Sequence, residues 1–268
     1  MASNAPQTGY APVNGLNMYY EIRGAGRPLV VLHGSFMTIE LMGELVPGLA
    51  RSRRVIALEF QGHGHTADID RLITYEQLAD DTAALLRHLG IGSSDIYGYS
   101  LGGGAALQFA MRHPELVRKL VIVSASYTSD GMYPEGLAAI EQITPELFDG
   151  TPWREAYDRT APHPEAFPAL VAKLKQLDMT PYEWPAEAVR AITAPTLIII
   201  GDSDGIRPEH AVAMFRLRGG GVFGDLAGLP AAQLAVLPGT THVGMLDRAD
   251  LLLAMVPPFL DAPVPATV

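Results

Sequence analysis

The 268-residue sequence contains no cysteine, so no disulfide, thiolate nucleophile or cysteine-ligated metal can contribute to its structure or chemistry. Basic residues are also scarce, because 19 lysines and arginines stand against 29 aspartates and glutamates, a formal net charge of −10. Since phosphate backbones are bound by basic surfaces, we expect no nucleic-acid partner. No apolar run approaches the roughly 20 residues that span a bilayer, and the first residues lack the basic and apolar segments of a secretory signal. We therefore expect a cytoplasmic protein without a membrane partner; the composition indicates nothing about its oligomeric state.

What the sequence does contain is enough apolar residues for a sizeable core: 48% are hydrophobic and only 18% charged. Short apolar runs, typical of strands buried on both faces, alternate with segments of helical periodicity. In one such segment, residues 74–90, Thr74 and Gln77 predict a capping box at the start of a helix. Asn14-Gly15 predicts the tight turn of a hairpin within residues 9–23. This alternation predicts an α/β fold with a mostly parallel central sheet flanked by helices.

One long interval interrupts the alternation. Between Ser124 and Thr196 about seventy residues show helical stretches and prolines but no strand pattern, too long a connection for a bare loop in a compact domain. We interpret it as an inserted helical cap. The predicted organisation is a core domain of residues 1–125 and 194–268, with a cap of residues 126–193.

A serine between small residues is the first candidate for chemistry. In Gly98-Tyr99-Ser100-Leu101-Gly102, an apolar strand pattern ends at the serine and a helical pattern begins just after it. A sharp strand-to-helix turn holds its central residue in a strained conformation with the side chain exposed, and its neighbours must be small. A glycine-rich turn in another kind of α/β protein fits this motif alone equally well.

A serine hydroxyl needs a general base, and the base needs a carboxylate to orient it. In an open parallel sheet these groups follow the carboxyl ends of strands. His242 and Asp204 each follow a predicted strand in this way. Asp202 and Asp130 are alternative positions for the acid, and the spacing favours Asp204.

The loop His33-Gly34-Ser35-Phe36 also follows a predicted strand, and one of its backbone N–H groups is a candidate donor to an oxyanion. His63 and His65 lie two positions apart, which suggests a metal site. Because no further histidine follows at a ligand spacing, we predict no metal and no other cofactor.

Four motifs, "VVLHGSF", "GYSLGG", "LIIIGDSD" and "LPGTTH", resemble those of the α/β-hydrolase superfamily in content and order, over nearly the whole chain. The resemblance implies a catalytic Ser100, Asp204 and His242, and an oxyanion hole made by the backbone N–H groups of Leu101 and Ser35, with Phe36 as the alternative to Ser35. "EFQGHGHT" is similar to a loop of the same family, from which it departs at Glu59 and Thr66.

The resemblance also implies the reaction class. Because the family's haloalkane dehalogenases and epoxide hydrolases use aspartate as nucleophile, Ser100 favours acyl transfer to water, and we expect a serine esterase. A lactonase, an amidase, a hydrolase of carbon–carbon bonds, and a slow-turnover signalling receptor remain alternatives. The insert contains both tryptophans, Trp153 and Trp184. With Phe36 and Tyr157, they are the residues that we predict to bind a small apolar or aromatic ester or lactone.

Overall fold

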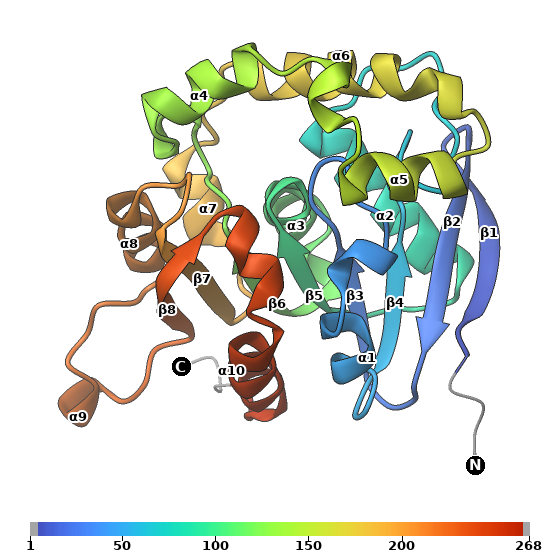
Figure 1. The fold of residues 1–268 in the computed structure, drawn as a ribbon. Helices are drawn as coiled ribbons and strands as arrows, with labels where there is room; N and C mark the ends of the chain where they lie inside the picture. The colour runs from blue at the N-terminus through green and yellow to red at the C-terminus, as the bar shows by residue number, and fades with distance from the viewer. Residues whose placement is uncertain (1–4, 265–268) are drawn as a thin grey trace.

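A twisted eight-stranded sheet runs through the part of the chain that the computed structural model describes, residues 5–264 (Figure 1). The first two strands form an antiparallel hairpin at one edge, and the other six are parallel to one another. The order across the sheet is β1-β2-β4-β3-β5-β6-β7-β8. The strands are β1 (Gln7–Val13), β2 (Leu16–Arg23), β3 (Pro28–Leu32), β4 (Arg54–Leu58), β5 (Ser94–Tyr99), β6 (Val117–Val123), β7 (Thr196–Ser203) and β8 (Ala232–Thr241). The predicted α/β class is confirmed, and residues 1–4 and 265–268 of the predicted core domain lie outside the described part.

Successive residues of the parallel strands point to opposite faces of the sheet and build two separate cores. In β3, Val30 and Leu32 belong to one core, whereas Leu29 and Val31 belong to the other. All four side chains are at most 1% exposed, which explains why these strands are apolar throughout rather than alternating.

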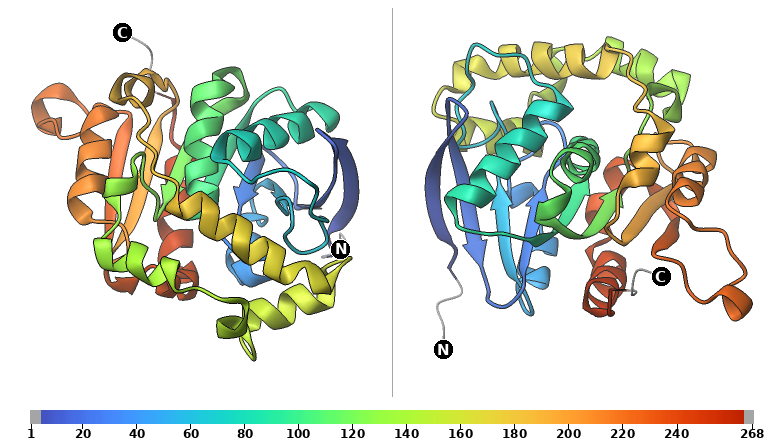
Figure 2. Two further views of the ribbon diagram at one scale, coloured as in Figure 1. Left: turned by 90° about the horizontal axis from the view of Figure 1, so that it is seen from above. Right: turned by 180° about the vertical axis from the view of Figure 1, so that it is seen from behind.

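Helices cover both faces of this sheet (Figure 2). One face carries α1 (Leu45–Leu49) and α10 (Ala249–Asp261), which pack against each other. The other carries α2 (Tyr75–His88), α3 (Leu101–Arg112) and α8 (Pro208–Leu217). A short helix, α9 (Gly224–Ala227), lies on the long loop between α8 and β8.

The segment between β6 and β7, here called the insert (residues 124–195), contains no strand among its described residues. It contains α4 (Pro134–Glu141), α5 (Pro152–Thr160), α6 (Phe167–Met179) and α7 (Ala186–Ala191). The first three lie across one end of the sheet, at the top of Figure 1. Short 3-10 helices complete the chain: Glu40–Met42, Pro114–Leu116, Ser129–Gly131, Pro145–Phe148, Pro164–Ala166 and Val243–Asp247.

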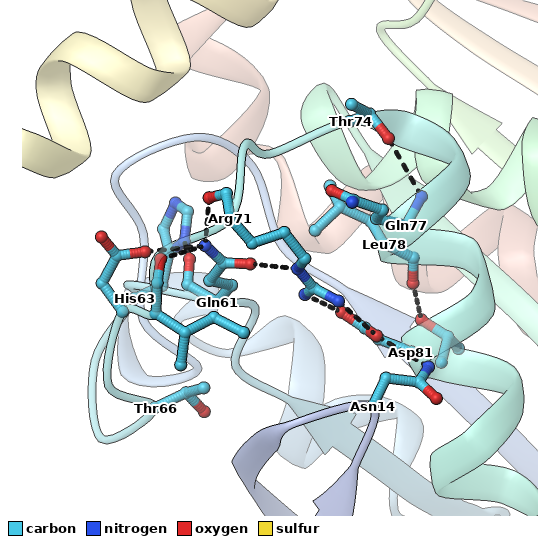
Figure 3. Close-up of polar contacts among 12 residues, drawn as sticks. Asn14, Gln61, His63, Thr66, Arg71, Thr74, Gln77, Leu78 and Asp81 are labelled. Carbon is cyan, nitrogen blue, oxygen red and sulfur yellow. Dashed lines mark hydrogen bonds and ion pairs between the residues drawn. The ribbon is translucent and has the colours of Figure 1, made fainter.

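Two local predictions meet different outcomes. Asn14 and Gly15 have φ angles of 47° and 88°, which confirms the tight hairpin turn. The capping box at α2 is only half formed. The hydroxyl of Thr74 accepts a hydrogen bond from the backbone N–H of Gln77, but the side-chain oxygen of Gln77 is buried without a partner (Figure 3).

A polar network holds the loop after β4 against α2 (Figure 3). Asp81 on α2 is fully buried, and its carboxylate accepts hydrogen bonds from the guanidinium of Arg71 and the side-chain amide of Asn14. Gln61 in turn accepts from Arg71 and donates to Asp68. These hydrogen bonds tie the loop that carries His63 and His65 to α2.

Candidate active site

Ser100 occupies the turn between β5 and α3 in a strained conformation, with φ 55° and ψ −117°. Its glycine neighbours allow the strand and the helix to approach closely. A Cβ at Gly98 would lie 2.1 Å from the carbonyl oxygen of Gly102, and one at Gly102 would lie 2.3 Å from that of Leu32. No side chain fits at either position without moving the backbone, so the small residues of the motif are explained by packing.

The Ser100 hydroxyl lies against an imidazole that is itself held by a carboxylate. His242, directly after β8, places Nε2 2.8 Å from the Oγ of Ser100 and Nδ1 2.7 Å from an oxygen of Asp204, directly after β7. Because the Asp204 carboxylate can only accept, Nδ1 carries the proton and Nε2 is free to accept the proton of Ser100. The hydroxyl of Tyr99 also donates to the carbonyl oxygen of His242 at 2.8 Å, which fixes the backbone of the histidine.

Asp204 is 4% exposed and is held by several donors. The Ser124 hydroxyl donates to one carboxylate oxygen at 2.6 Å, and the Ile206 N–H donates to the other at 3.1 Å. Burial raises the pKa of Asp204, but the hydrogen bonds and charge of His242, together with those donors, outweigh burial and leave the pKa below its usual value. The carboxylate therefore stays ionised beside the imidazole.

The alternative acids lie elsewhere. Asp202 is exposed and accepts hydrogen bonds from the backbone N–H groups of Gly239 and Thr240, which pins the loop before His242. Asp130 accepts from the Thr128 hydroxyl at the surface. Neither contacts the imidazole of His242.

The backbone N–H groups of Leu101 and Ser35 have no acceptor among the described residues, and neither has that of Phe36, the alternative to Ser35. Leu101 begins α3, where the first N–H groups of a helix lack intrahelical partners, and Ser35 lies in the loop after β3. Both residues line the same cavity as Ser100. His33 holds the base of this loop, because its Nδ1 donates to the Gly34 carbonyl at 2.7 Å while its Nε2 accepts from the Phe60 N–H. Burial lowers the pKa of His33 to about 3, so this ring is neutral and structural.

A cavity of about 440 Å³ lies between the carboxyl ends of the strands and the insert, with Ser100 and His242 in its wall. Most of the other lining residues are apolar or aromatic. The insert contributes Met132, Ile140, Ile143, Phe148, Trp153, Asp178 and Tyr182, and the rest of the chain contributes Phe36, Met37, Tyr75, Tyr99, Ile206, Val243 and Leu246 among others.

Of the four residues predicted to bind substrate, the structure places Phe36 and Trp153 in this lining and leaves Tyr157 and Trp184 outside it. The prediction for the latter two is therefore corrected. Tyr157 is 4% exposed and packs its ring against Phe167 within the insert. Trp184 is 7% exposed and packs its ring, tilted by 33°, against that of Tyr182, which itself lines the cavity. Both side chains belong to the core that joins the insert to the sheet. The number of aromatic residues in the insert does not indicate which of them point into the cavity and which into this core.

Sequence reasoning missed three groups at the site. Tyr99 directly precedes the serine in the glycine motif, and Ser124 directly follows β6, the strand next to β5, so their positions carried a signal. Ser124 shares with Ser100 a positive φ, 53°, which turns its side chain toward Asp204. Asp178 lies near the end of α6 and had no such signal.

Metal binding was predicted to be absent, and no group of three or more potential ligands occurs within residues 5–264. His63 is buried and donates from Nδ1 to the Gln61 carbonyl oxygen, whereas Nδ1 of His65 bonds to the Glu59 carboxylate. Helices long and apolar enough to cross a membrane are also absent from these residues.

Comparison with known proteins identifies the family of the chain. A family model described as the alpha/beta hydrolase fold matches residues 27–178. The chain belongs to this family. The α/β hydrolase is 30% identical over 230 residues to the 2-hydroxymuconate semialdehyde hydrolase of Pseudomonas sp. (strain CF600), covering 76% of this chain and 80% of the relative. It is 26% identical to the pimeloyl-[acyl-carrier protein] methyl ester esterase of Neisseria meningitidis serogroup B, over 88% of this chain and 94% of the relative.

Among solved structures, the α/β hydrolase is similar to a meta-cleavage product hydrolase from Pseudomonas fluorescens IP01. The TM-score is 0.76 at 22% identity, covering 95% of this chain and 97% of that one, a likeness that shows the shared fold.

Proposed function

We propose that this α/β hydrolase is a serine esterase that cleaves a small apolar or aromatic carboxylic ester through an acyl-enzyme. The observation that carries the proposal is the continuous hydrogen-bonded series from Ser100 through His242 to a buried, ionised Asp204, opening into an apolar cavity. A hydroxyl, a base and an orienting carboxylate in this geometry are the parts that nucleophilic acyl transfer requires.

Each step then uses a group of this chain. Nε2 of His242 takes the Ser100 proton as Oγ attacks the ester carbonyl, and Asp204 stabilises the imidazolium. The N–H groups of Leu101 and Ser35 stabilise the oxyanion, each contributing about 3 kcal/mol to the transition state. The imidazolium protonates the leaving alcohol, and the same base then activates the water that hydrolyses the acyl-enzyme. The proposal needs no cofactor or metal.

The insert is proposed to act as a cap. Because it supplies much of the apolar wall opposite Ser100, a substrate bound there is compact and largely removed from water. Short p-nitrophenyl esters are therefore expected to be hydrolysed well and the palmitate ester poorly, without a rise in rate above the micellar concentration of the substrate.

A second candidate is hydrolysis of a bond other than an ester, such as a lactone, an amide or a carbon–carbon bond, on the same three residues. It is favoured by the similarity to the 2-hydroxymuconate semialdehyde hydrolase. A muconate-type substrate carries a carboxylate, which a lysine or arginine would bind. No lysine or arginine is among the described residues that line the cavity, so we prefer an uncharged ester over such a substrate for this chain.

The test compares wild type with Ser100→Ala on a panel of p-nitrophenyl esters, lactones and amides. We expect the variant to lose several orders of magnitude in kcat/KM on the preferred substrate class while its circular dichroism stays unchanged. An organophosphonate should label wild type once and the variant not at all. Labelling that persists in the variant, or a bound ligand without turnover as in a signalling receptor, would contradict the proposal.

A further inference from the structure

One acidic side chain lies in the wall of the cavity, whose described residues otherwise include no acidic residue, lysine or arginine. Asp178, on the last turn of α6, lines the same cavity as Ser100 and His242. The described lining contains no other aspartate or glutamate and no lysine or arginine. The proposed esterase mechanism makes no use of this carboxyl group.

Asp178 has no hydrogen-bond or ion-pair partner within residues 5–264, although α6 carries two lysines. Lys173 binds Asp68 at 2.7 Å outside the cavity, and Lys175 donates to the carbonyl oxygen of Ile143. Asp178 is half-buried, and a carboxyl group that is largely removed from water without a protein partner is costly. Its place in the wall of a substrate cavity indicates that a ligand supplies the missing contact.

The groups that face Asp178 from the neighbouring elements are phenols and the imidazole. Tyr75 comes from α2, Tyr182 from the segment after α6, and His242 from the loop after β8. Tyr182 shares a hydrogen bond with the Ser126 hydroxyl at 2.9 Å. Burial raises the pKa of Asp178 to about 7, while the charge of His242 opposes the rise. The group is therefore a carboxylate on the alkaline side of neutrality and a neutral acid below it.

We propose that Asp178 determines specificity, selecting esters whose apolar body carries a hydrogen-bond donor, an ammonium or a hydroxyl, and excluding esters that carry a second carboxylate. The inference rests on the proposed esterase function and names its substrate class. A donor placed against Asp178 replaces the contact that the protein lacks, and an ammonium adds charge attraction in a poorly solvated site. A carboxylate there meets like charge and no compensating cation.

The experiment uses rigid, nearly isosteric substrates. These are the p-nitrophenyl esters of benzoic acids that carry a methyl, hydroxymethyl, aminomethyl or carboxyl group, in both the meta and para positions. Each ester is named below by this ring substituent, so that the methyl ester is the p-nitrophenyl ester of methylbenzoic acid. The quantity measured is kcat/KM for each ester relative to the methyl ester, for wild type, Asp178→Asn and Asp178→Leu. Glu165→Gln is the matched control, because Glu165 is an exposed carboxylate of the insert that does not line the cavity.

At about pH 8 we expect wild type to prefer the aminomethyl ester, in at least one position, and Asp178→Asn to reduce that preference by about 10- to 100-fold, the effect of one charge-assisted hydrogen bond. The hydroxymethyl ester should show a smaller loss, and the carboxyl ester should gain. Asp178→Leu should favour the methyl ester, and the control should leave all ratios as in wild type. Ratios that do not change in Asp178→Asn, or that change equally in Glu165→Gln, would overturn the inference.

The pH profile supplies an independent readout. The ratio of the aminomethyl to the methyl ester should rise through about pH 7 as Asp178 ionises, while the alkylammonium stays protonated. Because His242 acts as the base on both esters, its contribution to the rates cancels in this ratio. A ratio with the same pH dependence in wild type and Asp178→Asn would assign the preference to another group.

Failure of the esterase proposal is recognised separately. Loss of turnover of every ester in Ser100→Ala supports that proposal whatever the ratios are. If wild type hydrolyses none of them, binding of aryl methyl ketones with the same substituents, measured by calorimetry, tests Asp178 without turnover. An affinity order that favours the aminomethyl ketone in wild type but not in Asp178→Asn supports the specificity role; equal affinities overturn it.

Discussion

Asp178→Asn should stabilise this protein, by an amount that grows with pH. The carboxyl group of Asp178 has a pKa of about 7 in the folded protein against a usual value of 3.8, which we take for the unfolded chain. Below 3.8 both states are protonated and no difference in stability arises. Between the two values the unfolded chain ionises and the folded protein does not, so wild type loses up to about 1.4 kcal/mol of unfolding free energy per pH unit.

The magnitude follows from the same two values. At about pH 5 the destabilisation of wild type is about 1.5 kcal/mol, and above about pH 8 it reaches a constant value of about 4 kcal/mol. This is an upper value, because the side chain keeps some exposure within the cavity. Asparagine has the shape of the protonated acid and no charge at any pH, so the variant does not undergo this loss.

Urea-induced unfolding of wild type and Asp178→Asn, followed by circular dichroism between pH 5 and 9, measures the difference directly. We expect the two proteins to diverge as pH rises and to run parallel in the alkaline range. Glu165→Gln should show no comparable divergence, since Glu165 is 77% exposed. Equal unfolding free energies of wild type and Asp178→Asn across this range would refute the reasoning, because they would mean that Asp178 is solvated or paired in the folded protein.

Other expectations concern residues around the nucleophile and the cavity. Asp204→Asn should lower kcat by about 10⁴-fold, because an amide favours the wrong tautomer of the imidazole, whereas Asp202→Asn should have a far smaller effect; equal losses in steady-state assays would reassign the acid. Ser124→Ala should lower kcat by about tenfold through loss of one hydrogen bond to the ionised carboxylate, with KM little changed. Trp153→Ala should alter the preference among aliphatic and aromatic esters, because Trp153 lines the cavity. Trp184→Ala should instead lower the unfolding free energy by about 3–5 kcal/mol, as a buried aromatic does, and leave the preference unchanged.

Much of the fold was predictable because its signals are local. The buried strands are continuous apolar runs, and the hairpin turn is specified by Asn14-Gly15. Proline normally weakens a helix interior, yet α10 continues through Pro257 and Pro258 to Asp261. Its buried residues, among them Val256, pack against the sheet and outweigh the hydrogen bonds that the prolines remove. Such tertiary packing is not visible in local sequence.

In the candidate site, too, the residues with a local sequence signal could be predicted and those placed by tertiary packing could not. Ser100, Asp204 and His242 could be located because each follows directly after a strand, and parallel strands bring their carboxyl ends to one edge. The cavity wall could not be predicted, because it depends on which way the helices of the insert face. Asp178 lies near the end of α6, and nothing in the sequence distinguishes this aspartate from an exposed one.

The order of elements along the chain has a consequence for how the site is assembled. Ser100 and His242 are 142 residues apart, and the histidine follows β8, the last strand and one edge of the sheet. A nascent chain that ends before β7 contains the serine but neither its base nor the carboxylate. During refolding, phosphonate labelling should therefore lag behind the recovery of secondary structure, since it requires a contact between residues 142 positions apart. Reaction of Ser100 with a phosphonate thus reports complete folding, because the serine becomes reactive only when the final strand has formed.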